Sequence, residues 1–155
     1  MNEKMMEKAV QLALESAQTK NGGPFGAVIV KEGLIVGIGK NSVTTQNDPT
    51  AHAEVMAIRD ACRNLNTFQL DGCDIYTSCE PCPMCLGAIY WARPRKVYFA
   101  ATQQDAAQIG FDDQFIYNEI AKDKSERMIE MRQLQPKGYL KPFEYWDRLS
   151  DKNRY

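Results

Sequence analysis

Three residues have the types and the spacing of zinc ligands. His52, the single histidine of the sequence, precedes Cys82 and Cys85, which form a Cys-x-x-Cys pair. Imidazole and thiolate are ligands that zinc prefers, and a catalytic zinc keeps three protein ligands and one open position. Two cysteines three residues apart at a helix start face one point, and the helix N-terminus favours their thiolates. The pattern predicts a catalytic site with one Zn²⁺ per chain.

Glu54 is the candidate catalytic residue. It follows His52 by two residues and is expected on another side of the same helix, so that it faces a water at the metal without ligating the metal. Zinc lowers the pKa of such a water to about 7, and a group that moves protons is still required. We therefore expect Glu54 to act as the general base and acid.

Other interpretations of the cysteines are open. A thioredoxin-like Cys-x-x-Cys pair needs no upstream His-x-Glu. Cys79 extends the pair to Cys-x-x-Cys-x-x-Cys, which is typical of iron–sulfur proteins, but no cysteine follows Cys85. A structural zinc needs a fourth ligand, for which Cys79 is available. We favour catalytic zinc and expect Cys79 to be a small buried residue at a strand end, while the sequence indicates no role beyond packing for Cys62 and Cys73.

Hydrophobic periodicity and turn signals predict the elements that position these residues. Helices are expected over the first 20 residues and at 51–65, 82–93, 114–121 and 142–151, and strands at 25–31, 34–40, 74–79, 96–101 and 128–134. The strand at 96–101 is apolar throughout and is expected to be buried on both faces. The pattern predicts a three-layer α/β/α sandwich with a mixed central sheet of about five strands.

Length and charge limit the class of protein. The 155 residues suit one domain, 1–155. Lys plus Arg is 19 and Asp plus Glu is 20, which argues against a dedicated nucleic-acid-binding protein. The sequence shows no apolar run of the length that crosses a membrane and no signal-peptide pattern at its start. We expect a cytoplasmic protein with reduced thiols and no membrane partner.

The chain resembles a known family in the two segments that carry these motifs. Residues 47–54 (NDPTAHAE) and 80–89 (EPCPMCLGAI) are similar to the zinc motifs of the cytidine deaminase superfamily. The resemblance is to its purine branch, which contains small bacterial guanine deaminases and tRNA adenosine deaminases. It extends from Gly22 to Ala101 and, for the guanine deaminases, into 110–117 (GFDDQFIY). It implies a cytidine deaminase-like fold and the zinc-dependent hydrolysis of an amino group from a base.

Guanine is the expected substrate, with xanthine and ammonia as products. The near-neutral charge is unlike that of an enzyme that holds a polyanion, and the C-terminal third resembles that of the free-base enzymes. The alternatives are adenosine-to-inosine deamination at the wobble position of tRNA, deamination of cytosine or another small heterocycle, and a non-catalytic zinc-stabilised interaction domain. Glu54 argues against the last, since a structural zinc has no use for an unligated carboxylate.

The resemblance also implies substrate-binding residues. Phe25 would stack on the purine, Asn41 would hydrogen-bond the base edge, the Ala53 backbone N–H would bind a ring carbonyl, and Asp113 would accept hydrogen bonds from the amine and a ring N–H. Three of these residues have a structural alternative, namely a core position for Phe25, a turn for Asn41 and a helix cap for Asp113.

The C-terminal tail, residues 136–155, is expected to be helical and to help close the active site. It carries several aromatic residues, of which Phe143 and Trp146 suit packing, while Tyr155 lies beyond the helix and is a candidate substrate contact. A free base offers no ribose or phosphate to hold, so it must be enclosed. We expect a homodimer, with exchange of the tails between subunits as one arrangement.

Overall fold

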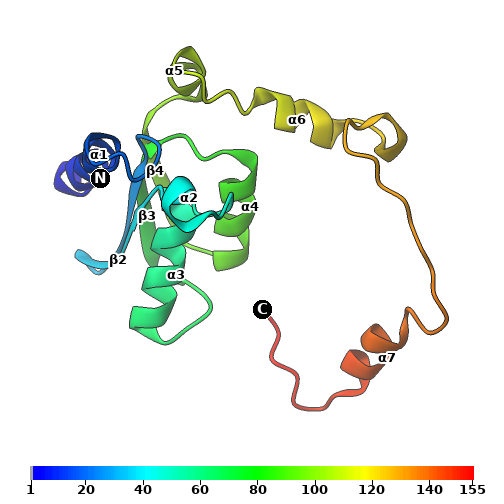
Figure 1. Cartoon of the computed structure of the whole chain (residues 1–155). Coiled ribbons are helices and arrows are strands. Elements are labelled where there is room, and N and C mark those ends of the chain that lie inside the picture. The colour runs from blue at the N-terminus through cyan, green and yellow to red at the C-terminus, as the bar shows by residue number, and fades with distance from the viewer. Residues whose placement is uncertain (1) are drawn as a thin grey trace. The chain divides into compact units, whose positions relative to one another are not determined.

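The computed structural model describes residues 2–155 (Figure 1), and the chain divides into two units. The first unit runs to Phe115 and contains the sheet. The second unit spans Ile116–Tyr155.

The first unit is built on a four-stranded sheet in the order β2-β1-β3-β4 (Figure 1). The strands are β1 (Gly26–Lys31), β2 (Leu34–Lys40), β3 (Cys73–Cys79) and β4 (Lys96–Ala101). β1 is antiparallel to β2 and β3, and β3 is parallel to β4, which confirms the predicted mixed sheet. Glu32 and Gly33 join β1 to β2 with φ values of 51° and 82°, the positive φ pair that a tight hairpin needs.

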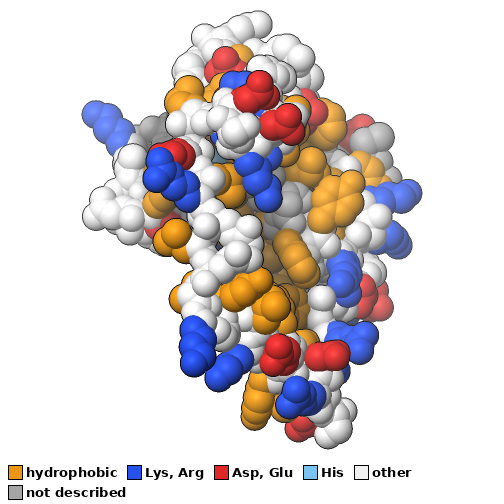
Figure 2. All heavy atoms as spheres, turned by 90° about the vertical axis from the view of Figure 1, so that its right-hand side faces the viewer, with side chains coloured by type: hydrophobic (Ala, Val, Ile, Leu, Met, Phe, Trp, Pro, Cys, Tyr) orange, Lys and Arg blue, Asp and Glu red, His pale blue; other side chains and the backbone are white. Residues whose placement is uncertain are grey.

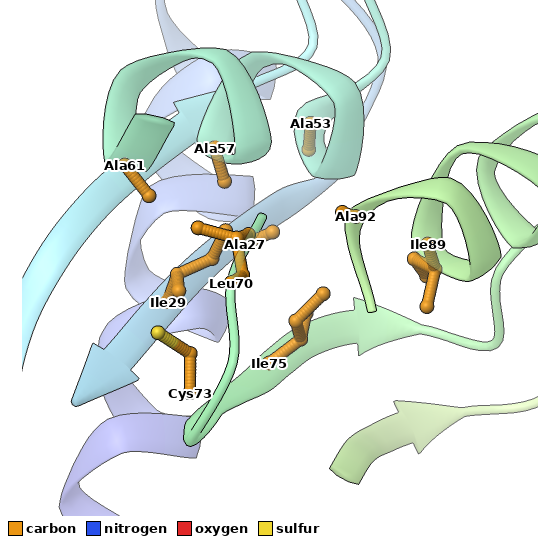
Figure 3. Close-up of a cluster of buried hydrophobic side chains, with 10 residues drawn as sticks. All are labelled: Ala27, Ile29, Ala53, Ala57, Ala61, Leu70, Cys73, Ile75, Ile89 and Ala92. Carbon is orange, nitrogen blue, oxygen red and sulfur yellow. The ribbon is translucent and has the colours of Figure 1, made fainter. Parts of the chain in front are cut away.

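Helices cover both faces of this sheet, as predicted. They are α1 (Glu3–Gln18), α3 (Ala53–Leu65) and α4 (Pro83–Ala92). α1 packs on one face, where Leu12 joins Val28 and Tyr76 in a buried cluster. α3 and α4 pack on the opposite face over Ile29 and Ile75 (Figure 3). Side chains alternate along each strand, so one sheet supports two separate cores.

α3 and β2 approach closely because both carry small residues. Ala53, Ala57 and Ala61 recur every fourth residue and point from α3 into the buried cluster (Figure 3). On β2, a Cβ added to Gly39 would lie 1.9 Å from the carbonyl oxygen of Ala53. Only glycine leaves room there. Gly39 therefore allows β2 to lie directly against the first turn of α3, which carries His52 and Glu54.

Two short helices were not predicted. α2 (Val43–Gln46) and α5 (Gln103–Gln108) lie in segments without apolar periodicity. The hydroxyl of Thr102 accepts from the backbone N–H of Asp105, whose carboxylate accepts from the backbone N–H of Thr102. This capping box fixes the start of α5 and is a signal that the sequence contains.

The prediction for the fifth strand was wrong, and so was the burial predicted for 96–101. Residues 128–134 form no strand in the structure, and their apolar side chains are exposed, Met128 by 81% and Leu134 by 83%. A strand needs a hydrogen-bonded neighbour, and this segment has none within the described chain. β4 is consequently an edge strand, and Phe99 on it is 48% exposed.

The second unit contains helices and extended chain. α6 (Gln114–Ala121) starts at the end of the first unit and is followed by η1 (Lys124–Glu126) and α7 (Lys141–Arg148). Local hydrogen bonds hold its first part, since Glu119 accepts from the backbone N–H of Met128 at 2.6 Å and Arg127 donates to the carbonyl of Ile120 at 3.1 Å. In the part of the chain that the structure describes, no helix combines the length and apolar character that a bilayer crossing requires.

Candidate zinc site

Two helix N-termini meet at the candidate site. His52 is the N-cap of α3 and Cys82 is the N-cap of α4, both with extended backbone. Pro83 fits the first position of α4, because an N–H there would have no partner within the helix. Sγ of Cys82 accepts from the backbone N–H of Cys85 at 3.5 Å. The helix starts therefore present their free N–H groups and partial positive charge to the thiols.

The side chains of His52, Cys82 and Cys85 form a group that suits one metal ion. Nδ1 of His52 lies 3.5 Å from each Sγ, and the three donor atoms lie within 4.8 Å of one another. Zinc bonds of about 2.3 Å to sulfur and about 2.0 Å to nitrogen, at tetrahedral angles, require N···S separations of about 3.5 Å. Both the donor types and their spacing fit Zn²⁺.

The charges at the site also favour a cation. Hydrogen bonds that Cys85 and His52 donate to the Cys82 sulfur lower the pKa of Cys82 to about 4. The hydrogen bond to Cys82 raises the pKa of His52. The pKa of Cys85 is raised by its hydrogen bond to the Cys82 sulfur and by burial. A dication between the two sulfurs would allow both to ionise, because its charge outweighs their mutual repulsion.

Glu54 lies beside the ligand group and is not part of it. It is the second residue of α3 and only 6% exposed. Oε1 accepts from the hydroxyl of Thr77 at 3.3 Å, and Oε2 accepts from Sγ of Cys85 at 3.4 Å. Burial raises the pKa of the Glu54 carboxyl. A buried carboxyl beside a metal site is suited to take up and release protons.

A cavity of about 280 Å³ opens at His52 and Glu54. Its other walls come from the segment before β1, the end of β3, α5 and the chain that follows α5. The residues that line it are Phe25, His52, Glu54, Cys79, Glu80, Cys82, Gln103, Ala106, Gly110, Phe111, Asp112 and Asp113. Ligand pockets commonly measure about 300–1,000 Å³, so this one suits a small heterocycle.

Two of the expected substrate-binding residues line this cavity. Phe25 is half-buried and meets Phe111 edge-to-face, with ring centroids 5.0 Å apart. Asp113 lies on the wall, where burial and the negative charge of Cys82 raise the pKa of its carboxyl. Both are placed where a bound molecule would meet them, and their roles toward a substrate stay predictions.

The other three expected contacts are not among the lining residues. The side-chain oxygen of Asn41 accepts from the backbone N–H groups of Gly23 and Val43 at 3.1 and 3.3 Å, which fits the turn alternative. Ala53 is fully buried as the first residue of α3. Tyr155 belongs to the second unit, and 67% of it is exposed. The substrate contacts proposed for these residues stay predictions.

Sequence reasoning assigned no role to Phe111 and Thr77, which the structure brings to the site. Phe111 lies in the 110–117 segment that carries the resemblance, whereas Thr77 gave no signal beyond its place in a strand. Cys79 ends β3, is 7% exposed and lines the cavity. The metal-binding group found among the described residues has three members without Cys79, which does not support the structural-zinc alternative. Burial raises the pKa of the Cys79 thiol to about 11.

The fold and the ligand group together define the class of protein. The family described as "Cytidine and deoxycytidylate deaminase zinc-binding region" matches residues 1–101, which include the three ligands and Glu54. The chain belongs to this family of deaminases, and His52, Cys82 and Cys85 are placed to hold one zinc ion.

Its relatives differ in how much of the chain they match. Guanine deaminase from Bacillus subtilis is 56% identical over 154 residues, 99% of both chains. An X-ray structure of guanine deaminase from that organism has a TM-score of 0.96 and 57% identity, covering 100% of this chain and 99% of the other. A tRNA-specific adenosine deaminase from Aquifex aeolicus is 48% identical over 98 residues, 61% of this chain and 65% of the relative. The similarity to the Bacillus protein therefore includes nearly the whole second unit.

Proposed function

We propose that the protein hydrolyses guanine to xanthine and ammonia. The observation that carries this proposal is a buried carboxylate, Glu54, whose oxygens lie next to a three-ligand zinc group at a cavity the size of one small heterocycle. The similarity to a guanine deaminase along 99% of the chain supports guanine as the base.

Glu54 carries the protons in this reaction. A zinc ion held by His52, Cys82 and Cys85 would supply a water whose pKa is near 7. The carboxylate accepts a proton as the water oxygen bonds to C2 of guanine, and it passes a proton to the neighbouring ring nitrogen. Glu54 then takes the proton of the new C2 hydroxyl and gives it to the amino group, so that the C2–N bond breaks, ammonia leaves and a carbonyl forms at C2. One water is consumed, and no oxidation takes place.

Residues of the cavity wall orient the base. The ring of Phe25 stacks on the purine, with Phe111 packed edge-on against it. Asp113 accepts hydrogen bonds from N–H donors at the base edge. An ionised carboxylate is suited to this role because it offers only acceptors. Asn41 uses its oxygen within the protein, which leaves its NH₂ group to donate to an acceptor on the base. The backbone N–H of Ala53, at the start of α3, serves a ring carbonyl.

The second unit completes the site in a homodimer, with tails exchanged between subunits as one arrangement. Two features support this part of the proposal. β4 leaves one edge of the sheet unpaired, and the apolar side chains of 128–134 are exposed. An open sheet edge and exposed apolar side chains are surfaces that a second subunit can cover. In this arrangement Tyr155 lies near the base edge.

Deamination of adenosine in tRNA is the second candidate, because the Aquifex relative is 48% identical over its matched part. One assay separates the two. Ammonia release is measured for guanine, adenine, cytosine, guanosine and an anticodon stem–loop at equal enzyme concentrations. We expect turnover of guanine well above that of the others. Turnover of the stem–loop without turnover of guanine would replace the proposed function with the second candidate.

Asp113→Ala tests the substrate assignment separately from the metal. We expect guanine turnover to be lost while zinc stays bound, because unpaired donors of a buried base cost about 1–3 kcal/mol or more. Asp71→Ala, at an exposed position before β3, is the matched control and should behave as the wild type. Normal guanine turnover by the Asp113 variant would show that another group selects the base.

A further inference from the structure

Thr77 places a hydroxyl in a row of otherwise apolar or thiol side chains. Side chains alternate along β3, so Cys73, Ile75, Thr77 and Cys79 share one face, and the first two pack in the core beneath α3. Thr77 is only 1% exposed. Valine has nearly the same shape and would avoid burying a polar group, so packing alone does not account for the hydroxyl.

The partner of this hydroxyl is the carboxylate of Glu54. Oγ1 of Thr77 donates to Oε1 at 3.3 Å, and the carboxylate is itself only 6% exposed. The contact joins the central strand β3 to the first turn of α3. A β-branched side chain in a central strand has little rotational freedom about χ1, so Thr77 is a rigid anchor for the longer and more flexible side chain of Glu54.

The two oxygens of the Glu54 carboxylate have different surroundings. Oε2 lies 3.4 Å from Sγ of Cys85, on the side of the ligand group, whereas Oε1 lies toward the strand. A cysteine that ligates zinc does so as a thiolate, which has no hydrogen to donate. With zinc bound, Cys85 therefore no longer donates to Glu54, whereas the hydroxyl of Thr77 still donates to its carboxylate.

We propose that Thr77 is a positioning residue, whose hydroxyl anchors Oε1 of Glu54 so that Oε2 faces the reacting atoms. The inference rests on the proposed function, in which Glu54 carries the protons. Without the anchor, the carboxylate rotates about its own bonds and spends less time in the productive orientation. Misplacement of a catalytic group slows the chemical step and leaves the binding of a base that contacts other residues unchanged.

The wild type and Thr77→Val form a matched pair that isolates the hydroxyl. Thr77→Val removes it and keeps the shape, and Thr77→Ser keeps it and removes a methyl group. Should the valine variant not fold, Thr77→Ala and Thr77→Ser form a second pair that differs only in the hydroxyl. We expect kcat for guanine to fall by about tenfold or more in the valine and alanine variants, with KM and zinc content close to wild type. The serine variant should keep most of the wild-type kcat.

Ile75→Val is the control for packing, because it removes a methyl group from the same row of the same strand. It should lower Tm at unchanged kcat. A valine variant with the kcat of the wild type, or a serine variant as slow as the alanine variant, would overturn the positioning role. A wild-type enzyme that leaves guanine untouched would instead overturn the proposed function, so the two failures are distinguishable.

Discussion

The two units of the chain differ in what their residues contact. In the first unit, the ligand group and Glu54, the proposed proton carrier, lie at the starts of two helices that pack over a sheet, and Glu54 and Cys85 are buried. In the second unit, no residue of 116–155 is buried, although the segment is rich in large apolar side chains. On the face drawn in Figure 2, hydrophobic side chains lie exposed among charged ones. The chemistry is thus specified by contacts within the first unit.

The exposed apolar side chains of the second unit indicate that their burial depends on a surface outside this unit. α7 is amphipathic in sequence, yet Phe143 and Tyr145 on it are 72% and 71% exposed. Burying a large side chain contributes about 1.5–3 kcal/mol, which these residues do not gain from their own unit. Their contribution is therefore expected to come from a surface outside the unit. Substitutions in the first unit and truncation of the second unit should therefore separate the catalytic step from the enclosure of the base.

The largest effect is expected from loss of a ligand. Cys82→Ala removes a thiolate and the sulfur that caps α4, so that zinc, guanine turnover and part of the stability should be lost together, since metal binding contributes folding energy. Elemental analysis and thermal unfolding check this. Cys62→Ala, a half-buried cysteine outside the ligand group, should keep its zinc. Active wild-type protein without zinc, or with iron and labile sulfide, would contradict the assignment of the metal.

Glu54→Gln should leave the fold and the metal in place and remove the chemistry. The amide keeps the shape and can still accept from Thr77, but it cannot carry a proton. We expect the rate for guanine to fall about 10²–10⁴-fold with zinc retained. Steady-state kinetics and zinc content are the measurements, with Glu15→Gln on α1 as the control. A variant that keeps more than about a tenth of the wild-type rate would mean that another residue moves the proton.

Truncation of the second unit tests enclosure. Deletion of 152–155 should leave zinc content and Tm unchanged and should raise KM or lower kcat for guanine by about tenfold, since a free base must be held by its faces and edges. Lys152 donates to the carbonyl of Asp147 at 2.6 Å near the end of α7, so Lys152→Ala is the control that separates fraying of the helix from loss of Tyr155. Full activity of the truncated protein would show that the tail only packs.

Mixing experiments extend this test to exchange between subunits. A Glu54→Gln chain keeps its tail, and a truncated chain keeps its proton carrier. If tails are exchanged, a mixed dimer contains one site with both parts, and activity should rise above that of either variant alone. Mixtures that only average the two activities would argue against exchange.

The ligand group could be predicted from the sequence because its chemistry is local. His52 with Glu54, and Cys82 with Cys85, lie in short motifs that begin helices, and helix geometry fixes their relative positions. Thr77 and Phe111 could not be predicted in the same way. Their contacts depend on the packing of β3 against α3 and on the path of the chain after α5, which no local pattern specifies.

The sheet shows the same limit. The hairpin and the strand–helix–strand unit of β3, α4 and β4 follow from periodicity and turn residues. The strand expected at 128–134 does not form, because no other strand of the described chain pairs with it. An apolar segment indicates that its side chains favour burial, but it does not indicate which strand would pair with it. The burial expected for β4 was wrong because β4 is an edge strand of the sheet, and none of its side chains is fully covered.

The smallest effect is expected from an ion pair of the first unit away from the ligand group. The guanidinium of Arg95 donates to both oxygens of Asp74 at 3.0 and 2.7 Å, and this hydrogen bonding holds the pKa of Asp74 below its ordinary value. Because the folded-state pKa is lower than that of the unfolded chain, the carboxylate contributes stability above pH about 4, which is lost as the pH falls through the folded-state pKa. Arg95 is largely exposed, so solvent screening keeps the contribution small.

Asp74→Asn should therefore lower Tm by a few degrees near neutral pH, and the difference from wild type should shrink as the pH falls below about 4. Thermal unfolding from neutral to acidic pH measures this, with Asp71→Asn at the exposed turn before β3 as the control. The kcat and KM for guanine should not change, since the pair lies outside the residues that line the cavity. A difference in Tm that persists unchanged at acidic pH would mean that packing of Asp74, and not its charge, stabilises the start of β3. A loss of turnover would show that stability and chemistry of the first unit are coupled through β3, the strand that also carries Thr77.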